Sequence, residues 1–156
     1  YEMVARVLRD SPIEHGERDI LAQAFANRFG ADNPLFDSSR FDAAIFRGEI
    51  YRGSTARHGG WTRQDYEMIA DILRNAQISG AARVVTAQTF ADRLYYDNPR
   101  FNANIFFKRA VGPDYETAVY RWNRDRWARE LSVPARGVER FRRPAEVHVK
   151  SYRRRA

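Results

Sequence analysis

Cysteine is absent from the 156-residue sequence and only three histidines are present, which narrows the chemistry open to the chain. A chain without cysteine has no disulfide, no thiol nucleophile and no cysteine-ligated zinc site. His15, His58 and His148 do not form the H-E-x-x-H spacing of a helical metal site, and no glycine-rich nucleotide motif or G-x-S-x-G motif occurs. We therefore expect a protein without catalytic residues, without a bound metal and without a cofactor.

Long apolar runs are also missing. No run approaches the roughly 18 residues that a membrane-spanning helix needs, so we expect no membrane partner. No secretory signal is visible, which favours a cytoplasmic protein. The sequence starts inside its first motif and lacks an initiator methionine, so we expect natural N-terminal residues before Tyr1.

Lysine is scarce too, with only Lys108 and Lys150, so nearly all positive charge comes from arginine. Residues 1–112 hold 15 basic and 14 acidic residues, whereas residues 113–156 hold 12 basic and 6 acidic ones. The C-terminal part therefore carries +6 of the total net charge of +7. Such local asymmetry is more informative about partners than the overall charge.

An internal repeat is the clearest feature that is present. Residues 1–41 align with residues 66–106 at a constant offset of 65 without a gap, and 18 of the 41 positions are identical. The shared positions include Tyr-Glu-Met at the start and Asp-Asn-Pro near the end. We interpret the chain as a tandem duplication of one small helical unit.

Apolar residues recur at helical spacing in both copies, so the predicted fold class is all-α. Each copy is expected to form two helices, a turn and a short third helix, and a longer basic helix follows. The predicted helices span residues 2–9, 19–29, 39–47, 66–75, 83–96, 102–109 and 114–131. Trp122 and Trp127 in the last helix are expected to belong to the core, and the alternative is that they mark an interaction surface.

The expected organisation has five parts. They are a first helical unit (1–47), a glycine-rich linker (48–60), a second unit (61–112), a basic helix (113–133) and an arginine-rich tail (134–156). A single three-helix unit buries only a small core. Packing of the two units through their apolar faces, with a pseudo-twofold relation, would bury more.

The repeated Asp-Asn-Pro motif has two interpretations. Its Asp and Asn could bind a cation or the backbone of a partner. We favour the alternative, in which the motif stops one helix and Asn33 is the N-cap of the next, with Pro34 in its first turn. Gly30 is expected to cap the preceding helix in a left-handed conformation. The repeated Tyr-Glu pair is interpreted as placing a glutamate in a first helical turn rather than in a cleft.

Residues 61–74, 90–93 and 97–101 resemble the two ends of small helical proteins common in actinobacterial phages, which usually carry a single copy. The resemblance covers both copies, about half of the chain, and does not extend to the basic C-terminal segment. It implies a phage or mobile-element origin, and hence a place in the host cytoplasm or in the virion. It implies no catalytic residue, because none is established for that group.

The C-terminal segment carries the strongest functional signal, because its arginines are interleaved with aromatic residues. Guanidinium groups pair with phosphates, aromatic rings stack on exposed bases, and counterion release gives affinity without sequence choice. The predicted nucleic-acid contacts are Arg121, Arg124, Arg129, Arg136, Arg140, Arg142, Arg143, Lys150, Tyr152, Arg153, Arg154 and Arg155. We therefore predict a non-catalytic protein that binds DNA or RNA with low sequence specificity.

Two other interpretations of this segment stay open. It could be the docking arm of a protein-interaction module, such as a minor virion component or an inhibitor of a host or defence protein. In that case residues 146–152 could add a strand to a partner's sheet. It could also be a solvated tail that only adds solubility. A homo-oligomer is compatible with each of these interpretations.

Overall fold

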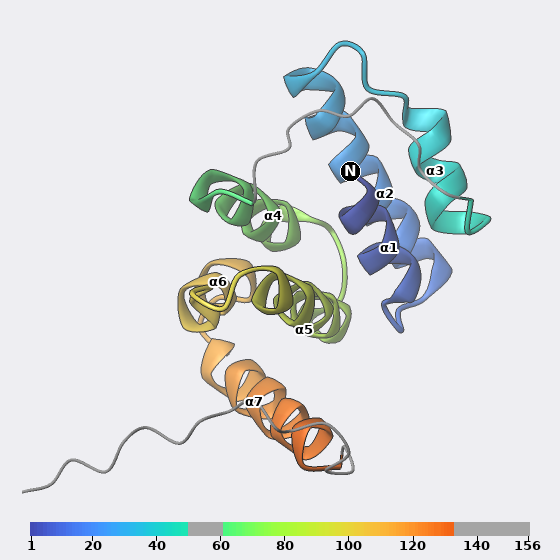
Figure 1. The fold of residues 1–156 in the computed structure, drawn as a ribbon. Coiled ribbons are helices and arrows are strands. Elements are labelled where there is room, and N and C mark those ends of the chain that lie inside the picture. The colour runs from blue at the N-terminus through green and yellow to red at the C-terminus, as the bar shows by residue number, and fades with distance from the viewer. Residues whose placement is uncertain (50–60, 133–156) are drawn as a thin grey trace, which may run out of the picture.

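The computed structural model describes residues 1–49 and 61–132, with side chains up to residue 130. Over these ranges the chain is helical and has no strand, which confirms the predicted all-α class. The helices are α1 (Glu2–Asp10), α2 (His15–Asp32), α3 (Ser38–Phe46), α4 (Arg63–Asn75), α5 (Gly80–Asp97), α6 (Ala103–Ala110) and α7 (Tyr115–Ser132) (Figure 1). Most of the predicted linker and all of the predicted tail, including residues 146–152, lie outside the described residues.

Side-chain caps explain why several helices begin earlier than predicted. Thr62 and Asp65 form a capping box, in which the Thr62 hydroxyl accepts from the Asp65 amide at 3.3 Å and the Asp65 carboxylate accepts from the Thr62 amide at 2.8 Å. Ser79 caps α5 by accepting from the Ala82 amide at 3.1 Å. α4 and α5 therefore each begin about a turn before the apolar periodicity indicates. α2 also begins about a turn early, at His15, but its N-cap Glu14 forms no capping hydrogen bond through its side chain.

The Asp-Asn-Pro motif ends a helix, as predicted, but it does not cap the next one. α2 continues through Gly30, so the predicted left-handed cap at this residue is wrong. The Asn33 Oδ1 accepts from the Leu35 amide at 3.0 Å, and its Nδ2 donates to the Tyr1 hydroxyl at 3.3 Å. Because this side chain is engaged in the turn, Asp37 is the N-cap of α3, and the predicted N-cap role of Asn33 is wrong.

The same hydrogen bonds occur 65 residues further along the chain. The Asn98 side chain accepts from the Arg100 amide at 3.0 Å and donates to the Tyr66 hydroxyl at 3.2 Å. Asn33 thereby connects the end of α2 to Tyr1, directly before α1. Asn98 in the same way connects the end of α5 to Tyr66, in the first turn of α4. These contacts give the repeated motif a structural role that requires no ligand.

A second recurring contact involves Arg18 in α2 and Arg83 in α5, which the sequence analysis did not single out. Each guanidinium spans the end of the preceding helix and the loop that follows it, with donor–acceptor distances from 2.9 to 3.4 Å. The accepting carbonyls are those of Leu8, Ser11 and Ile13 for Arg18, and of Leu73, Ala76 and Ile78 for Arg83. Both arginines thereby fix the angle between two consecutive helices.

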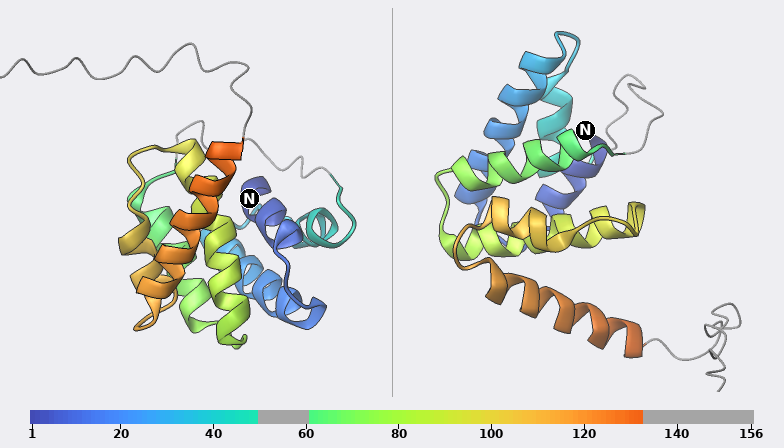
Figure 2. Two further views of the ribbon diagram at one scale, coloured as in Figure 1. Left: turned by 90° about the horizontal axis from the view of Figure 1, so that it is seen from below. Right: turned by 90° about the vertical axis from the view of Figure 1, so that its left-hand side faces the viewer.

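The helices form two groups, α1–α3 and α4–α6, with α7 on the far side of the second group (Figures 1 and 2). The groups meet where α1 packs against α5 and α2 packs against α4. At this junction lie the fully buried rings of Phe25 and Phe90, with centroids 5.7 Å apart. These two phenylalanines are 65 residues apart, which is the offset that aligns residues 1–41 with residues 66–106. A single buried cluster continues from the first group into the second and under α7.

A left-handed glycine redirects the chain between α6 and α7. Gly112 has a φ of +91°, which favours glycine over residues with a side chain. An added Cβ would also lie 1.5 Å from Nη1 of Arg74, which donates to the Val111 carbonyl at 2.7 Å. This turn places α7 against α5 and α6.

The two tryptophans of α7 have different surroundings. Trp122 is 5% exposed, and its ring centroid lies 5.9 Å from the ring centroids of both Tyr95 and Phe107. Trp127 is 61% exposed, so its predicted place in the core is wrong. Five residues along a helix rotate a side chain by about 140°, because each turn contains about 3.6 residues. The two rings therefore cannot both lie on the buried face of α7.

Candidate nucleic-acid interface

The predicted phosphate-binding arginines of α7 differ in the contacts that they form with other residues of the chain. Arg129 donates from Nη2 to both carboxylate oxygens of Asp92 in α5 at 2.8 Å, and Asp92 also accepts from Nε1 of Trp122 at 2.7 Å. Arg124 donates to its neighbour Asp125 at 2.9 Å. Arg129 therefore helps to hold α7 on α5, whereas the contact of Arg124 with Asp125 lies within α7.

Arg126 lies against aromatic rings instead of facing solvent. Its Cζ is 4.4 Å from the centroid of the Tyr95 ring and 5.2 Å from that of Trp122, which are cation–π distances. Its side chain is 20% exposed, and its Nε has no hydrogen-bond partner among the described residues. Arg121 is exposed and makes no ion pair within the described ranges. Of the α7 arginines, Arg121 and Arg124 are thus the best placed to meet an external anion.

The net charge of the chain lies almost entirely beyond α7. Residues 113–132 hold four basic and four acidic residues, whereas residues 133–156 hold eight basic and two acidic ones. The segment 113–132, which was predicted to be a basic helix, therefore has no net charge. The other predicted contacts lie outside the described residues, namely Arg136, Arg140, Arg142, Arg143, Lys150, Tyr152, Arg153, Arg154 and Arg155.

α7 presents an exposed aromatic face that includes Tyr120, a residue that the sequence analysis did not single out. Tyr120 is 69% exposed, and Trp127, seven residues later, is 61% exposed. A spacing of seven residues places two side chains on the same side of a helix, and Arg124 lies between them on that side. The spacing is visible in the sequence, but the orientation of this face toward solvent depends on how α7 packs.

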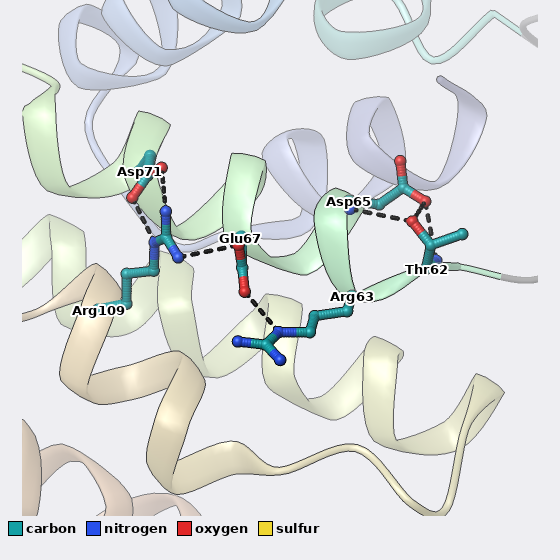
Figure 3. Close-up of polar contacts among 6 residues, drawn as sticks. All are labelled: Thr62, Arg63, Asp65, Glu67, Asp71 and Arg109. Atoms are coloured by element: carbon teal, nitrogen blue, oxygen red, sulfur yellow. Dashed lines mark hydrogen bonds and ion pairs between the residues drawn. The ribbon is translucent and has the colours of Figure 1, made fainter.

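A groove of about 430 Å³ lies between α2 and α4, and Arg109 of α6 also lines it. Arg109 of α6 bridges two α4 carboxylates: it donates to Asp71 at 2.6 and 2.7 Å and lies 3.1 Å from Glu67 (Figure 3). Arg63 donates to the other oxygen of Glu67 at 2.7 Å. Two carboxylates and two guanidinium groups balance each other, so the network ties α4 to α6 and offers no unbalanced charge to a ligand.

These ion pairs lower the pKa values of both carboxyl groups. Hydrogen bonding from Arg63 holds the pKa of Glu67 below its ordinary value, with a further contribution from Arg109. Hydrogen bonding from Arg109 likewise lowers the pKa of Asp71. The interpretation of the Tyr-Glu pair as a first-turn glutamate is correct for Glu2 but wrong for Glu67, because α4 begins at Arg63.

Replacing Asp71 by asparagine is expected to lower stability at neutral pH only slightly, by less than about 1 kcal/mol, because the pair with Arg109 is exposed. The pKa of Asp71 is lowered on folding, so its stabilising contribution is complete above the ordinary value of 3.8 and is lost as pH falls through the folded pKa. Urea unfolding at pH 7 and at pH 2 would measure this. Asp125→Asn, which removes a pair within one helix, is the matched control. A difference that persisted at pH 2 would contradict the electrostatic explanation.

No group of three or more His, Asp or Glu side chains in the described ranges is arranged to hold a metal ion. None of the helices in that part of the chain is long and apolar enough to cross a membrane. The resemblance to small helical phage proteins remains a prediction from the sequence. Comparison of the chain with protein-family models, with curated proteins and with solved structures found no match.

Proposed function

We propose that this chain is a non-catalytic nucleic-acid-binding protein of a phage or mobile element, which contacts phosphates through its basic C-terminal segment. The observation that carries the proposal is the distribution of charge. Residues 1–132 have a net charge of +1 and residues 133–156 a net charge of +6. Several arginines of the helical part are already engaged by carboxylates or by backbone carbonyls. A polyanion would therefore meet its main attraction in the last 24 residues.

We further propose that α1–α3 and α4–α6 are duplicated copies that pack with a pseudo-twofold relation and act as a scaffold. Residues close to a two-fold axis meet their own equivalents, as Phe25 and Phe90 do. The pairing of α1 with α5 is matched by that of α2 with α4, which is the exchange such an axis produces. The recurring contacts of Arg18 and Arg83 support the same relation.

Binding in this mode depends on phosphate contacts and is expected to have low sequence specificity. Each phosphate neutralised by an arginine or lysine releases a condensed counterion, so affinity falls steeply with salt. Contacts to phosphate carry no direct information about base sequence. If six or more of the eight basic residues in 133–156 are engaged, affinity for duplex DNA should fall by about 10³-fold or more between about 50 and 200 mM salt.

Fluorescence anisotropy with labelled duplex DNA and single-stranded RNA tests this proposal. We expect salt-sensitive binding by the full chain and none by a chain truncated after Val133. Replacing Arg153, Arg154 and Arg155 together by glutamine should make the dependence of log affinity on log salt shallower by about 3 for duplex DNA, close to one unit per contact.

A matched control removes the same charge from the helical part. Arg6, Arg28 and Arg47 each pair with an acidic residue within residues 1–49, so their joint replacement by glutamine should leave the salt dependence unchanged. An equal effect of the two triple variants would mean that overall charge, and not the C-terminal segment, governs binding. Absence of binding at about 20 mM salt would overturn the proposal and favour the protein-docking alternative.

A further inference from the structure

The aromatic residues of α7 divide into two sets. Trp122 is buried, and Tyr115 and Val119 pack against the same core, so these residues attach the helix to α5 and α6. Tyr120 and Trp127 lie away from that core and are 69% and 61% exposed. The second set is therefore not part of the core that attaches the helix.

The exposed pair, hereafter the Tyr120/Trp127 face, has no partner within the described part of the chain. Neither ring is in contact with another aromatic ring, with a cation or with a hydrogen-bonding group there. A single exposed ring is common on protein surfaces. Two rings on one side of a helix, about 10.5 Å apart along its axis, form a more specific arrangement, because seven residues rise by that distance.

Charge indicates which kind of partner this face suits. Arg124 lies between the two rings and is 62% exposed, and it forms an ion pair with the adjacent Asp125. Arg121 is exposed on the neighbouring side of the same helix. The helix leads directly into residues 133–156, which carry +6. Rings and guanidinium groups that are followed in the sequence by a strongly basic segment favour a partner with both aromatic surfaces and negative charge.

Single-stranded nucleic acid has both properties, whereas a duplex hides its base faces within the stack. Stacking on an aromatic side chain is sequence-tolerant, since every base has a π-face, and contributes about 1–3 kcal/mol per base. At the 3.4 Å spacing of stacked bases, a separation of about 10 Å corresponds to three base steps. Two bases of one strand can therefore reach the two rings while their phosphates pass Arg124.

We propose that the Tyr120/Trp127 face is a stacking platform for bases of single-stranded DNA or RNA. This inference rests on the proposed function, because the basic segment would supply the attraction for phosphates. It adds a preference for single strands that the tail alone does not require. The site consists of Tyr120 and Trp127 as stacking residues and of Arg121 and Arg124 as phosphate contacts.

The first test compares the affinity of the full chain for a labelled single-stranded oligonucleotide and for the duplex of the same sequence. Replacing Tyr120 and Trp127 together by alanine should weaken single-strand binding by about 30-fold or more, which corresponds to about 1 kcal/mol or more per ring. Duplex affinity should change less than twofold. Tyr96→Ala removes a ring that is 79% exposed on α5, and this control should change neither affinity.

The second test uses intrinsic fluorescence, because Trp127 is an exposed fluorophore. Base stacking on its ring should quench part of the emission of the full chain when the unlabelled single strand is added. Trp127→Phe should abolish that part of the quenching and keep single-strand affinity within about threefold, since phenylalanine also stacks on bases. Quenching that survived this substitution would place the bases elsewhere and overturn the proposal.

The outcomes separate this inference from the function on which it rests. If the full chain binds neither probe at low salt, the proposed function fails and the stacking platform fails with it. If the chain binds but the double alanine variant affects both probes equally or neither probe, only the platform is overturned. Analytical sedimentation tests whether the face instead mediates self-association. Concentration-dependent dimers that the double variant abolishes would assign the face to contact between copies of the chain.

The melting temperature of each variant should remain unchanged, because both rings are exposed.

Discussion

Replacing either Phe25 or Phe90 by alanine is expected to lower the free energy of unfolding by about 3–5 kcal/mol. Both side chains are fully buried at the junction of the two helical groups. The loss combines the removed apolar surface with the cavity left at a site where neighbouring rings cannot fully collapse. Because domains of this size are commonly stable by about 5–15 kcal/mol, each variant should be severely destabilised. Urea denaturation followed by circular dichroism measures the effect.

The two substitutions should also be coupled. Their ring centroids are 5.7 Å apart, and aromatic pairs at such distances contribute about 0.5–1.5 kcal/mol beyond area burial. A double-mutant cycle built with leucine in place of alanine keeps all variants folded and measures this coupling. We also expect a single unfolding transition, because the buried cluster includes residues of both groups and of α7.

Leu35→Ala is the control for this experiment, because Leu35 is 84% exposed and its replacement should change stability by less than about 0.5 kcal/mol. Two separate transitions, with Phe25→Leu affecting only one of them, would show that the helical groups unfold independently. Strict additivity of the two leucine variants would show that contact between the rings contributes nothing to stability.

Replacing Arg83 by methionine is expected to destabilise the protein by about 2–4 kcal/mol. The guanidinium donates to three carbonyls around the loop between α4 and α5, and methionine keeps much of the apolar stem but none of the donors. Hydrogen bonds to charged groups contribute about 1.5–3 kcal/mol each, and their effects at one site are not additive. Thermal and urea unfolding would measure the loss, and Arg18→Met should reproduce it in the first helical group.

Lysine at the same position provides a sharper test. It retains the charge but presents one ammonium group instead of a planar fork, so it cannot match all three carbonyls in the same geometry. Arg83→Lys should therefore fall between the wild type and the methionine variant. Arg121→Met, which removes an exposed arginine without an ion pair in the described ranges, should have little effect on stability. A loss of similar size at Arg121 would contradict the role assigned to the carbonyl contacts.

Local patterns predicted the helices well and their ends less well. The apolar periodicity located each helix that the structure describes, but three helices start about a turn earlier than predicted. At α4 and α5 the reason is capping by Thr62 and Ser79, whose side chains satisfy the first amides and allow polar residues to join the helix. The error at Asn33 has a related origin, because its side chain is engaged with the turn and with Tyr1.

The candidate site was predicted only in part. Identity between Arg18 and Arg83 was visible in the alignment of the two copies, but their carbonyl partners depend on the path of the following loop. The sequence likewise shows a row of arginines in α7 without showing that Arg129 binds Asp92 or that Arg126 lies against rings. The contacts of Arg129 with Asp92 and of Arg126 with Tyr95 join residues that are 37 and 31 positions apart.

The sequence by itself determined the helical class and the position of the excess charge, because the first depends on neighbouring residues and the second on composition. Tertiary structure alone decided that Trp122 is buried while Trp127 is exposed, and that Phe25 meets Phe90. Helical periodicity specifies which residues share a face, but the face that becomes buried depends on the helices available to cover it. That choice is made by packing between distant segments, since burial of apolar surface is non-directional and depends on the whole arrangement.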